Sequence, residues 1–225
     1  MSEIRNMIIG NGRSLGLFVL GATALVFSMF FLTRDQIKTN EHRVMVEQLE
    51  SVLQSIAYDN DILAQVSWLN VAQATGVNTP MPYYLAKQGK ALVAIVFTVI
   101  APDGYSGPIK LLIGLRPAGE ILSVRVIAHQ ETPGLGDGIE IKKSNWISQF
   151  DRQSLQKTAL ANWKVKKDAG QFDQLTGATI TPRAVVKAIR ALLIYFQANK
   201  TQLLHPHAHA HPQETQHATV SEDFK

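Results

Sequence analysis

The chain has 225 residues and a formal net charge of +4 from 22 basic and 18 acidic residues, a length that suits one compact domain with appendages. The basic residues are spread along the chain and form no dense block interleaved with aromatics, which argues against nucleic-acid binding. The chain contains no cysteine, so disulfides, thiolate nucleophiles and iron–sulfur ligation are excluded and redox chemistry would require a bound cofactor.

An uncharged apolar run occupies residues 14–33. As a helix it would cover roughly the 30 Å hydrocarbon core of a bilayer, so we predict a transmembrane helix after a short cytoplasmic N-terminus, residues 1–13. A cleaved signal peptide is the alternative, but its apolar region is shorter and ends at small residues, whereas this run ends in Met29–Leu32. Basic residues flank both ends, so charge alone does not decide the orientation.

Residues 34–57 are predicted to form a stalk helix, because apolar residues recur at three- and four-residue spacing between Val44 and Ile56. The stretch Gly76–Pro82 contains Asn78 and two prolines and is typical of a loop.

Three β-branched runs follow, at Ala91–Ala101, Ile109–Leu115 and Ile121–Ala128. They are separated by Pro-Asp-Gly and Pro-Ala-Gly turns, a pattern that predicts an antiparallel meander. At least three adjacent strands are therefore expected.

Helices are predicted after the strands, at residues 146–150, 152–161 and 182–199. The last has the clearest apolar stripe, composed of Val185, Val186, Ile189, Leu192, Leu193 and Phe196. We therefore predict an α+β fold for residues 58–199, a curved antiparallel sheet flanked by helices. Residues 200–225 are predicted to be a disordered His-rich tail, whose imidazoles offer weak metal binding as an alternative to a merely solvated segment.

The segment before the last helix carries the strongest chemical signal. Thr181 is expected as the N-cap and Pro182 as the first helical residue, so that the helix N-terminus faces Thr176, Gly177 and Thr179. Free backbone N–H groups and the positive end of the helix dipole favour a phosphate there, and the threonine hydroxyls add donors. A well-capped helix without a ligand explains the same residues.

The string Asp173-x-x-Thr176-Gly177-Ala178-Thr179 resembles the flavinylation signature of the FMN-binding domain family. The resemblance implies that a flavin transferase splits FAD and places the FMN phosphate on the hydroxyl of Thr179. It also implies that Asp173, Thr176, Gly177 and Ala178 serve recognition and fit.

Two further stretches, Gly104–Ile109 and His129–Gly136, resemble the remaining signatures of that family, in the same chain order. Independently, a glycine-rich loop leaving a strand exposes backbone donors and acceptors that suit the pyrimidine edge of a flavin. Four loop residues are expected to line the flavin, namely Glu131, Thr132, Gly134 and Leu135. Leu135 or Ile139 would cover the apolar ring edge, and His129 is interpreted as a structural hydrogen-bonding residue.

Over nearly its whole length the chain resembles the G subunits of Rnf/Rsx electron transport complexes. This implies an inner-membrane anchor, a periplasmic flavin domain and partner subunits that pass electrons between ferredoxin and NAD, with or without ion pumping, or keep a redox sensor reduced. The sequence shows no acid–base dyad, triad or metal site, so an electron relay is expected.

Two alternatives remain open from sequence. One is the C subunit of the sodium-pumping NADH:quinone reductase, which would be expected to have a Trp-containing loop at 104–109. The other is a non-redox, membrane-tethered interaction domain in which Thr-Gly-Ala-Thr only precedes a helix.

Overall fold

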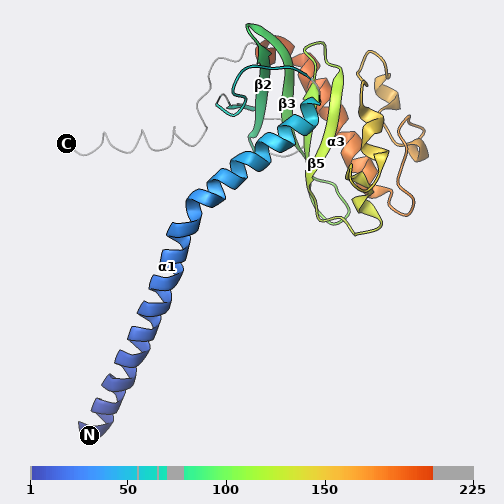
Figure 1. The fold of residues 1–225 in the computed structure, drawn as a ribbon. Helices are drawn as coiled ribbons and strands as arrows, with labels where there is room; N and C mark the ends of the chain where they lie inside the picture. The colour runs from blue at the N-terminus through green and yellow to red at the C-terminus, as the bar shows by residue number, and fades with distance from the viewer. Residues whose placement is uncertain (1, 55, 65, 70–78, 205–225) are drawn as a thin grey trace, which may run out of the picture. The chain divides into compact units, whose positions relative to one another are not determined.

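A computed structural model describes residues 2–54, 56–64, 66–69 and 79–204. The chain divides into two compact units, Met1–Glu47 and Gln48–Lys225. Helix α1 (Ser2–Leu53) fills the first unit and its end belongs to the second (Figure 1). Within it, Leu15–Arg34 is long and apolar enough to cross a membrane, and it is the one such stretch in the described part of the chain. Its large apolar side chains are exposed, as lipid contact would require.

The predicted transmembrane and stalk helices are one continuous helix, and its last turn is part of the folded domain. Val52 is fully buried, and its carbonyl accepts a hydrogen bond from the Ser123 hydroxyl at 2.8 Å. A Cβ added to Gly114 would lie 2.7 Å from a Val52 methyl carbon. The helix end at Val52 therefore packs on the sheet, ahead of the domain start predicted at residue 58.

The domain is built on a five-stranded antiparallel sheet in chain order. The strands are β1 (Val66–Leu69), β2 (Met81–Gln88), β3 (Ala91–Ala101), β4 (Ile109–Leu115) and β5 (Ile121–Ala128). The last three coincide with the three predicted strands, which confirms the meander. The first two were not predicted. Met81 and Pro82, expected at the end of a loop, begin β2, and residues 76–78 of that expected loop lie outside the described residues.

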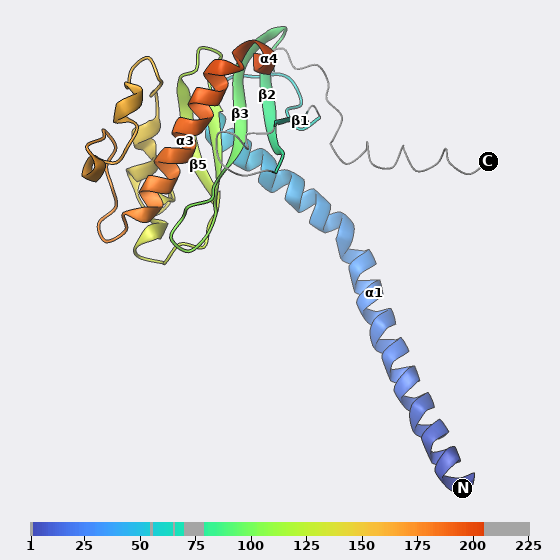
Figure 2. The same ribbon diagram turned by 180° about the vertical axis from the view of Figure 1, so that it is seen from behind.

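Helices cover both faces of the sheet. Helix α3 (Ile180–Ala198) lies across one face, and the end of α1 lies on the other, as the two opposite views show (Figure 1 and Figure 2). The ring of Phe97 on β3 meets that of Phe196 on α3 at 6.1 Å, and the whole apolar stripe predicted for this helix is buried. Strands covered on both sides read as continuous apolar runs, and this is the pattern of β3.

Short 3₁₀ helices connect β5 to α3. They are η1 (Gly136–Ile139), η2 (Asn145–Phe150), η3 (Leu160–Asn162) and η4 (Lys166–Asp168). The helix predicted at 146–150 is η2, but the one predicted at 152–161 is wrong. The backbone of Arg152 is left-handed, with φ of 61°, and the Ser154 hydroxyl accepts from the Lys157 amide at 3.2 Å, which favours a single turn.

A short helix, α4 (Lys200–Leu204), follows α3 and buries Leu203. The prediction of disorder is therefore wrong for residues 200–204. The rest of the predicted His-rich tail, residues 205–225, lies outside the described residues.

Candidate functional site

A cavity of about 500 Å³ opens where three loops meet the beginning of α3. Its volume is in the range of small-molecule and cofactor sites. It is lined by Tyr105, Glu131, Thr132, Leu135, Gly136, Gly177, Ala178, Thr179, Ile180 and Thr181. The loop after β3, the loop after β5 and the segment entering α3 all contribute, so the structure brings together the three stretches that the sequence singled out.

The carboxylate of Glu131 joins these three segments. Its side chain is 4 % exposed. One oxygen, Oε1, accepts the amide N–H of Ser106 at 3.1 Å, and Oε2 accepts the hydroxyl of Thr181 at 2.5 Å. A buried carboxylate is costly unless such donors replace water. The contact with Ser106 holds the loop after β3 against the loop after β5, and the contact with Thr181 holds the beginning of α3 against it.

Two glycines make room for this carboxylate. A Cβ on Gly104 would lie 2.8 Å from Oε1 of Glu131 and 2.1 Å from the carbonyl oxygen of Gly107. A Cβ on Gly136 would lie 2.7 Å from Oε2 and 2.9 Å from the Cβ of Glu131. Because real side chains do not approach so closely, both positions require glycine as long as Glu131 keeps its place.

His129 supports Glu131 from outside the cavity. Its Nδ1 accepts the backbone N–H of Glu131 at 3.0 Å, and its Nε2 lies 2.9 Å from Oε1 of Glu140. Since Nδ1 accepts, Nε2 must carry the proton that is donated to Glu140. His129 is thus a structural hydrogen-bonding residue, as interpreted from sequence, and it does not line the cavity.

The segment before α3 begins with a tight turn. The Ala178 amide donates to the Leu175 carbonyl at 3.2 Å, and Gly177, the third residue of this turn, has a φ of +77° that favours glycine. A Cβ on Gly177 would lie 3.2 Å from a methyl carbon of Leu135. The turn therefore packs against the loop after β5 and closes one side of the cavity.

Helix α3 begins earlier than predicted. Ile180 is its first residue and Thr179 its N-cap position, so Thr181 and Pro182 are the second and third helical residues. The prediction of Thr181 as N-cap is wrong because its hydroxyl is engaged by Glu131, 50 residues away in sequence. Pro182 is tolerated there since the amides of the first turn have no partner within the helix.

The three threonines of residues 176–181 differ in what their hydroxyls can do. Thr181 is 1 % exposed and bonded to Glu131. Thr176 is exposed and does not line the cavity. Thr179 is half-buried, lines the cavity, and its side chain makes no capping hydrogen bond. Its hydroxyl is therefore free of a capping role at a helix N-terminus, where an anionic group is favoured.

Ion pairs tie the loops around the cavity to their neighbours. These pairs are Lys187–Asp103 at 2.5 Å, Lys143–Asp137 at 3.5 Å, Lys166–Asp173 at 2.5 Å and the forked pair of Arg183 with Asp168, in which Nε lies 2.6 Å from Oδ2. Hydrogen bonding to the guanidinium of Arg183 lowers the pKa of Asp168. Apart from the buried carboxylate of Asp137, these charges are partly or largely exposed, so we assign the pairs to loop positioning.

Three predicted site residues lie outside the cavity lining, namely Asp173, Thr176 and Gly134. Asp173 anchors its loop, because its carbonyl accepts the Trp146 indole N–H at 2.7 Å. Gly134 shapes a turn with φ of +79° and donates its amide to Asp137 at 2.8 Å.

Of the two residues proposed as apolar cover, Ile139 is fully buried in the core and cannot serve, whereas Leu135 is 48 % exposed and lines the cavity. Three residues that line the cavity were not predicted from the sequence, namely Tyr105, Gly136 and Ile180. Tyr105 and Ile180 are large and exposed, and no periodicity marks such residues in loops. Tyr105 lies within, and Ile180 beside, the stretches that resembled the family signatures, and this position is the one sequence feature that pointed to them.

The cavity has the features that an FMN site needs. Exposed apolar side chains at Tyr105, Leu135 and Ile180 can cover an isoalloxazine, and glycine-rich backbone can meet its polar edge. The helix N-terminus at Thr179 suits the phosphate. The residues present therefore fit the cofactor.

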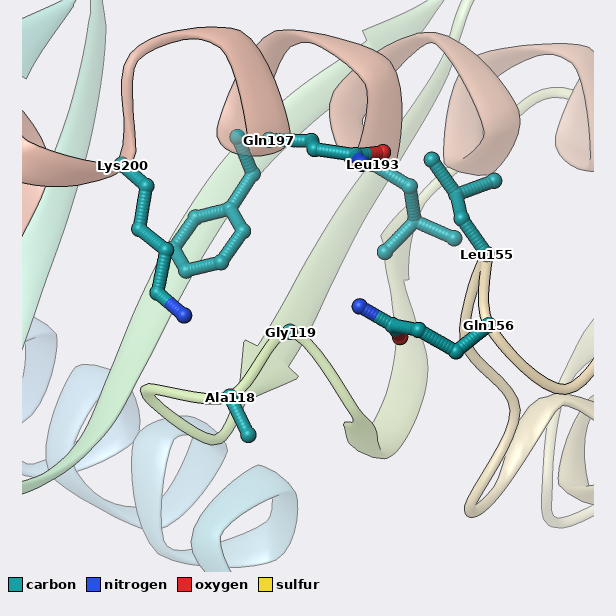
Figure 3. Close-up of a pocket in the computed structure, with 8 residues that line it drawn as sticks. Ala118, Gly119, Leu155, Gln156, Leu193, Gln197 and Lys200 are labelled. Carbon is teal, nitrogen blue, oxygen red and sulfur yellow. The ribbon is translucent and has the colours of Figure 1, made fainter.

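A second hollow does not fit an FMN phosphate. It measures about 230 Å³ and lies between the turn at Gly119, the loop at Gln156 and the last turns of α3 (Figure 3). Its lining contains no hydroxyl, and it adjoins the C-terminal end of the helix, where the dipole disfavours anions. The larger cavity is therefore the candidate site.

Comparisons with known proteins identify the domain and its family. The family model for the FMN-binding domain matches residues 104–194. The G subunit of an ion-translocating oxidoreductase complex from Shewanella baltica is 46 % identical over 89 % of this chain and 94 % of its own length. The corresponding G subunit of Shewanella loihica is 43 % identical over 89 % and 95 %, and that of Vibrio cholerae 44 % over 86 % and 92 %.

Among solved structures, the crystal structure of Shewanella oneidensis NqrC is similar, with a TM-score of 0.46 and 23 % identity over 67 % of this chain and 73 % of that one. The sequence identity to these G subunits over nearly the full length of the chain decides its family. This chain belongs to the family of G subunits of ion-translocating oxidoreductase complexes, and it joins an FMN-binding domain to an N-terminal helix able to anchor it in a membrane.

Proposed function

We propose that the chain is a membrane-anchored electron carrier whose FMN is held by a phosphoester bond to Oγ1 of Thr179. One observation carries the proposal. Of the three threonines in the segment that enters α3, Thr179 is the one that lines the cavity while its hydroxyl makes no capping bond and, unlike that of Thr181, is not bonded to Glu131.

The attachment requires FAD and a flavin transferase as a transient partner. The threonine oxygen bonds to the phosphorus on the FMN side of the FAD pyrophosphate, the pyrophosphate bond breaks, AMP leaves and the hydroxyl proton is released. Thr179 lines the cavity and is only half-buried, so an external enzyme can reach it. Thr181, at 1 % exposure, is shielded from such an enzyme.

Each part of the cavity has a role in holding the cofactor. The N-terminus of α3 stabilises the phosphoryl group, and Leu135 and Ile180 cover apolar ring surface. When bound, FMN supplies reversible uptake and release of electrons. The lining contains no histidine, lysine or cysteine, which suits an electron relay better than an enzyme with its own substrate chemistry.

The membrane setting follows from the relatives and the anchor helix. Their name describes one component of an ion-translocating oxidoreductase complex. We propose that this chain works with the other subunits of such a complex in the inner membrane, with its flavin domain on the periplasmic side. The complex would link ferredoxin and NAD, coupled to ion translocation, or reduce a redox sensor.

Covalent attachment is tested by producing the full chain together with a flavin transferase and examining the denatured protein on a gel under ultraviolet light. The wild type is expected to fluoresce, and Thr179→Ala to be dark. Thr132→Ala, which removes another hydroxyl from the same cavity, should still fluoresce. A dark wild-type band, with transferase activity confirmed on another substrate, would sink the proposal.

Orientation is testable because the chain has no cysteine. Ala161 is exposed, so Ala161→Cys in spheroplasts should react with a membrane-impermeant maleimide. Ser2→Cys should react only after permeabilisation. The reverse pattern would place the flavin domain in the cytoplasm.

A further inference from the structure

Glu131 is the one charged residue among those that line the cavity. Both of its hydrogen-bond donors are neutral, the Ser106 amide and the Thr181 hydroxyl. Within the described residues no cation pairs with it. Asp137, a buried carboxylate six positions further along the same loop, lies 3.5 Å from the ammonium of Lys143. The cavity thus holds one negative charge that no cation compensates.

We propose that Glu131 lowers the reduction potential of the FMN bound in this cavity. The inference rests on the proposed function, since flavin must occupy the cavity. An electron added to the flavin places negative charge beside a carboxylate that is almost fully removed from water. Like charges repel more strongly where water does not screen them, so reduction becomes less favourable and the reduced carrier gives up its electron more readily.

The surroundings of Glu131 keep this charge in place. A glutamate side chain normally turns its carboxylate toward water, but here each oxygen is held by a hydrogen bond and the chain is enclosed by Gly104 and Gly136. His129 fixes the backbone amide of the same residue. The charge therefore cannot move away when the flavin is reduced, and its electrostatic effect is preorganised.

Glu131→Gln is the central variant, because the amide has nearly the same shape and no charge. Its oxygen can still accept from the Ser106 amide, and its N–H can donate to the Thr181 hydroxyl. Asp137→Asn is the matched control. It removes one negative charge from a carboxylate that is also buried, at 7 % exposure, but that lies outside the lining and is paired with Lys143.

The midpoint potential is measured by spectroelectrochemical titration of the full chain in detergent, after a denaturing gel has shown covalent flavin in each variant. Glu131→Gln should raise the potential. We expect about a tenfold change in the ratio of reduced to oxidised flavin at a fixed potential, which corresponds to about 59 mV for one electron. Asp137→Asn should shift it far less.

Glu131→Asp separates charge from packing, since it keeps the charge but disturbs the hydrogen bonds. If Glu131 acts through its charge, the midpoint potential of Glu131→Asp should be close to that of the wild type. If its role is purely structural, the potential of Glu131→Asp should shift more than that of Glu131→Gln. An unchanged potential in flavin-loaded Glu131→Gln would overturn this inference and leave the proposed function standing. A Glu131→Gln protein that no longer folds or loads would do the same. A wild-type chain without flavin would contradict the proposed function itself.

Discussion

Replacement of Gly136 by alanine tests the geometry around Glu131. The new Cβ would lie 2.7 Å from Oε2 of Glu131, 2.9 Å from its Cβ and 3.1 Å from the Thr181 hydroxyl. The carboxylate cannot swing aside without breaking its bonds to Ser106 and Thr181. Overpacking costs about 1–3 kcal/mol, and loss of a hydrogen bond to a charged group about 1.5–3 kcal/mol. Alanine also reduces the conformational entropy of the unfolded chain, which stabilises the folded protein by about 0.4–1 kcal/mol.

The net loss in the free energy of unfolding should be about 3 kcal/mol for Gly136→Ala. For a domain of this size that lowers the melting temperature by about 6–12 °C, measured by circular dichroism, and flavin loading should fall as well. Gly134→Ala is the matched control on the same loop. Its Cβ meets nothing within 4 Å and its φ is +79°, so it should cost about 1–2 kcal/mol of backbone strain while flavin loading persists. Wild-type stability and loading in Gly136→Ala would refute the described packing of Glu131.

Three further predictions concern stability. Thr181→Val removes the donor to the buried Glu131 carboxylate and should lower the free energy of unfolding in urea by about 1–3 kcal/mol. Gly114→Ala should destabilise by a similar amount, about 1–3 kcal/mol, because its Cβ would meet a Val52 methyl carbon at 2.7 Å, and Val52→Ala in the same protein should recover part of that loss, as a double-mutant cycle would measure. Burial raises the pKa of Asp151, whose Oδ1 has no hydrogen-bond partner among the described residues. Since the folded protein binds this proton more tightly than the unfolded chain, ionised Asp151 costs stability above its folded pKa. Asp151→Asn should therefore stabilise at pH 7, and the gain should shrink as the pH falls through the folded pKa and the wild-type carboxyl becomes protonated.

The sequence was informative wherever structure depends on neighbouring residues. Strands β3 to β5 are long apolar runs bounded by turn residues, and their predicted limits agree with the structure. Strand β2 was missed because it opens with Met-Pro directly after another proline, a pattern typical of loops. It is held instead by pairing with β3 and by the stacking of Tyr83 on Phe97 at 5.6 Å, and neither contact is visible in local sequence.

In the candidate site too, local features were predictable from the sequence and contacts between distant residues were not. The three stretches that resembled family signatures converge on one cavity, so the location of the site was predictable. The contact between Thr181 and Glu131 spans 50 residues, and it explains why Thr181 is not the N-cap. The glycine requirements at positions 104 and 136 also depend on where Glu131 lies in three dimensions, which no pattern in either loop reveals.

The covalent bond to Thr179 is tested most directly by mass spectrometry of the full chain produced with a flavin transferase, followed by proteolysis and fragmentation of the peptide that contains residues 174–182. We predict an intact mass raised by one FMN less one water, with the added group on Thr179. An unmodified chain, or FMN located on Thr176 or Thr181, would contradict the account.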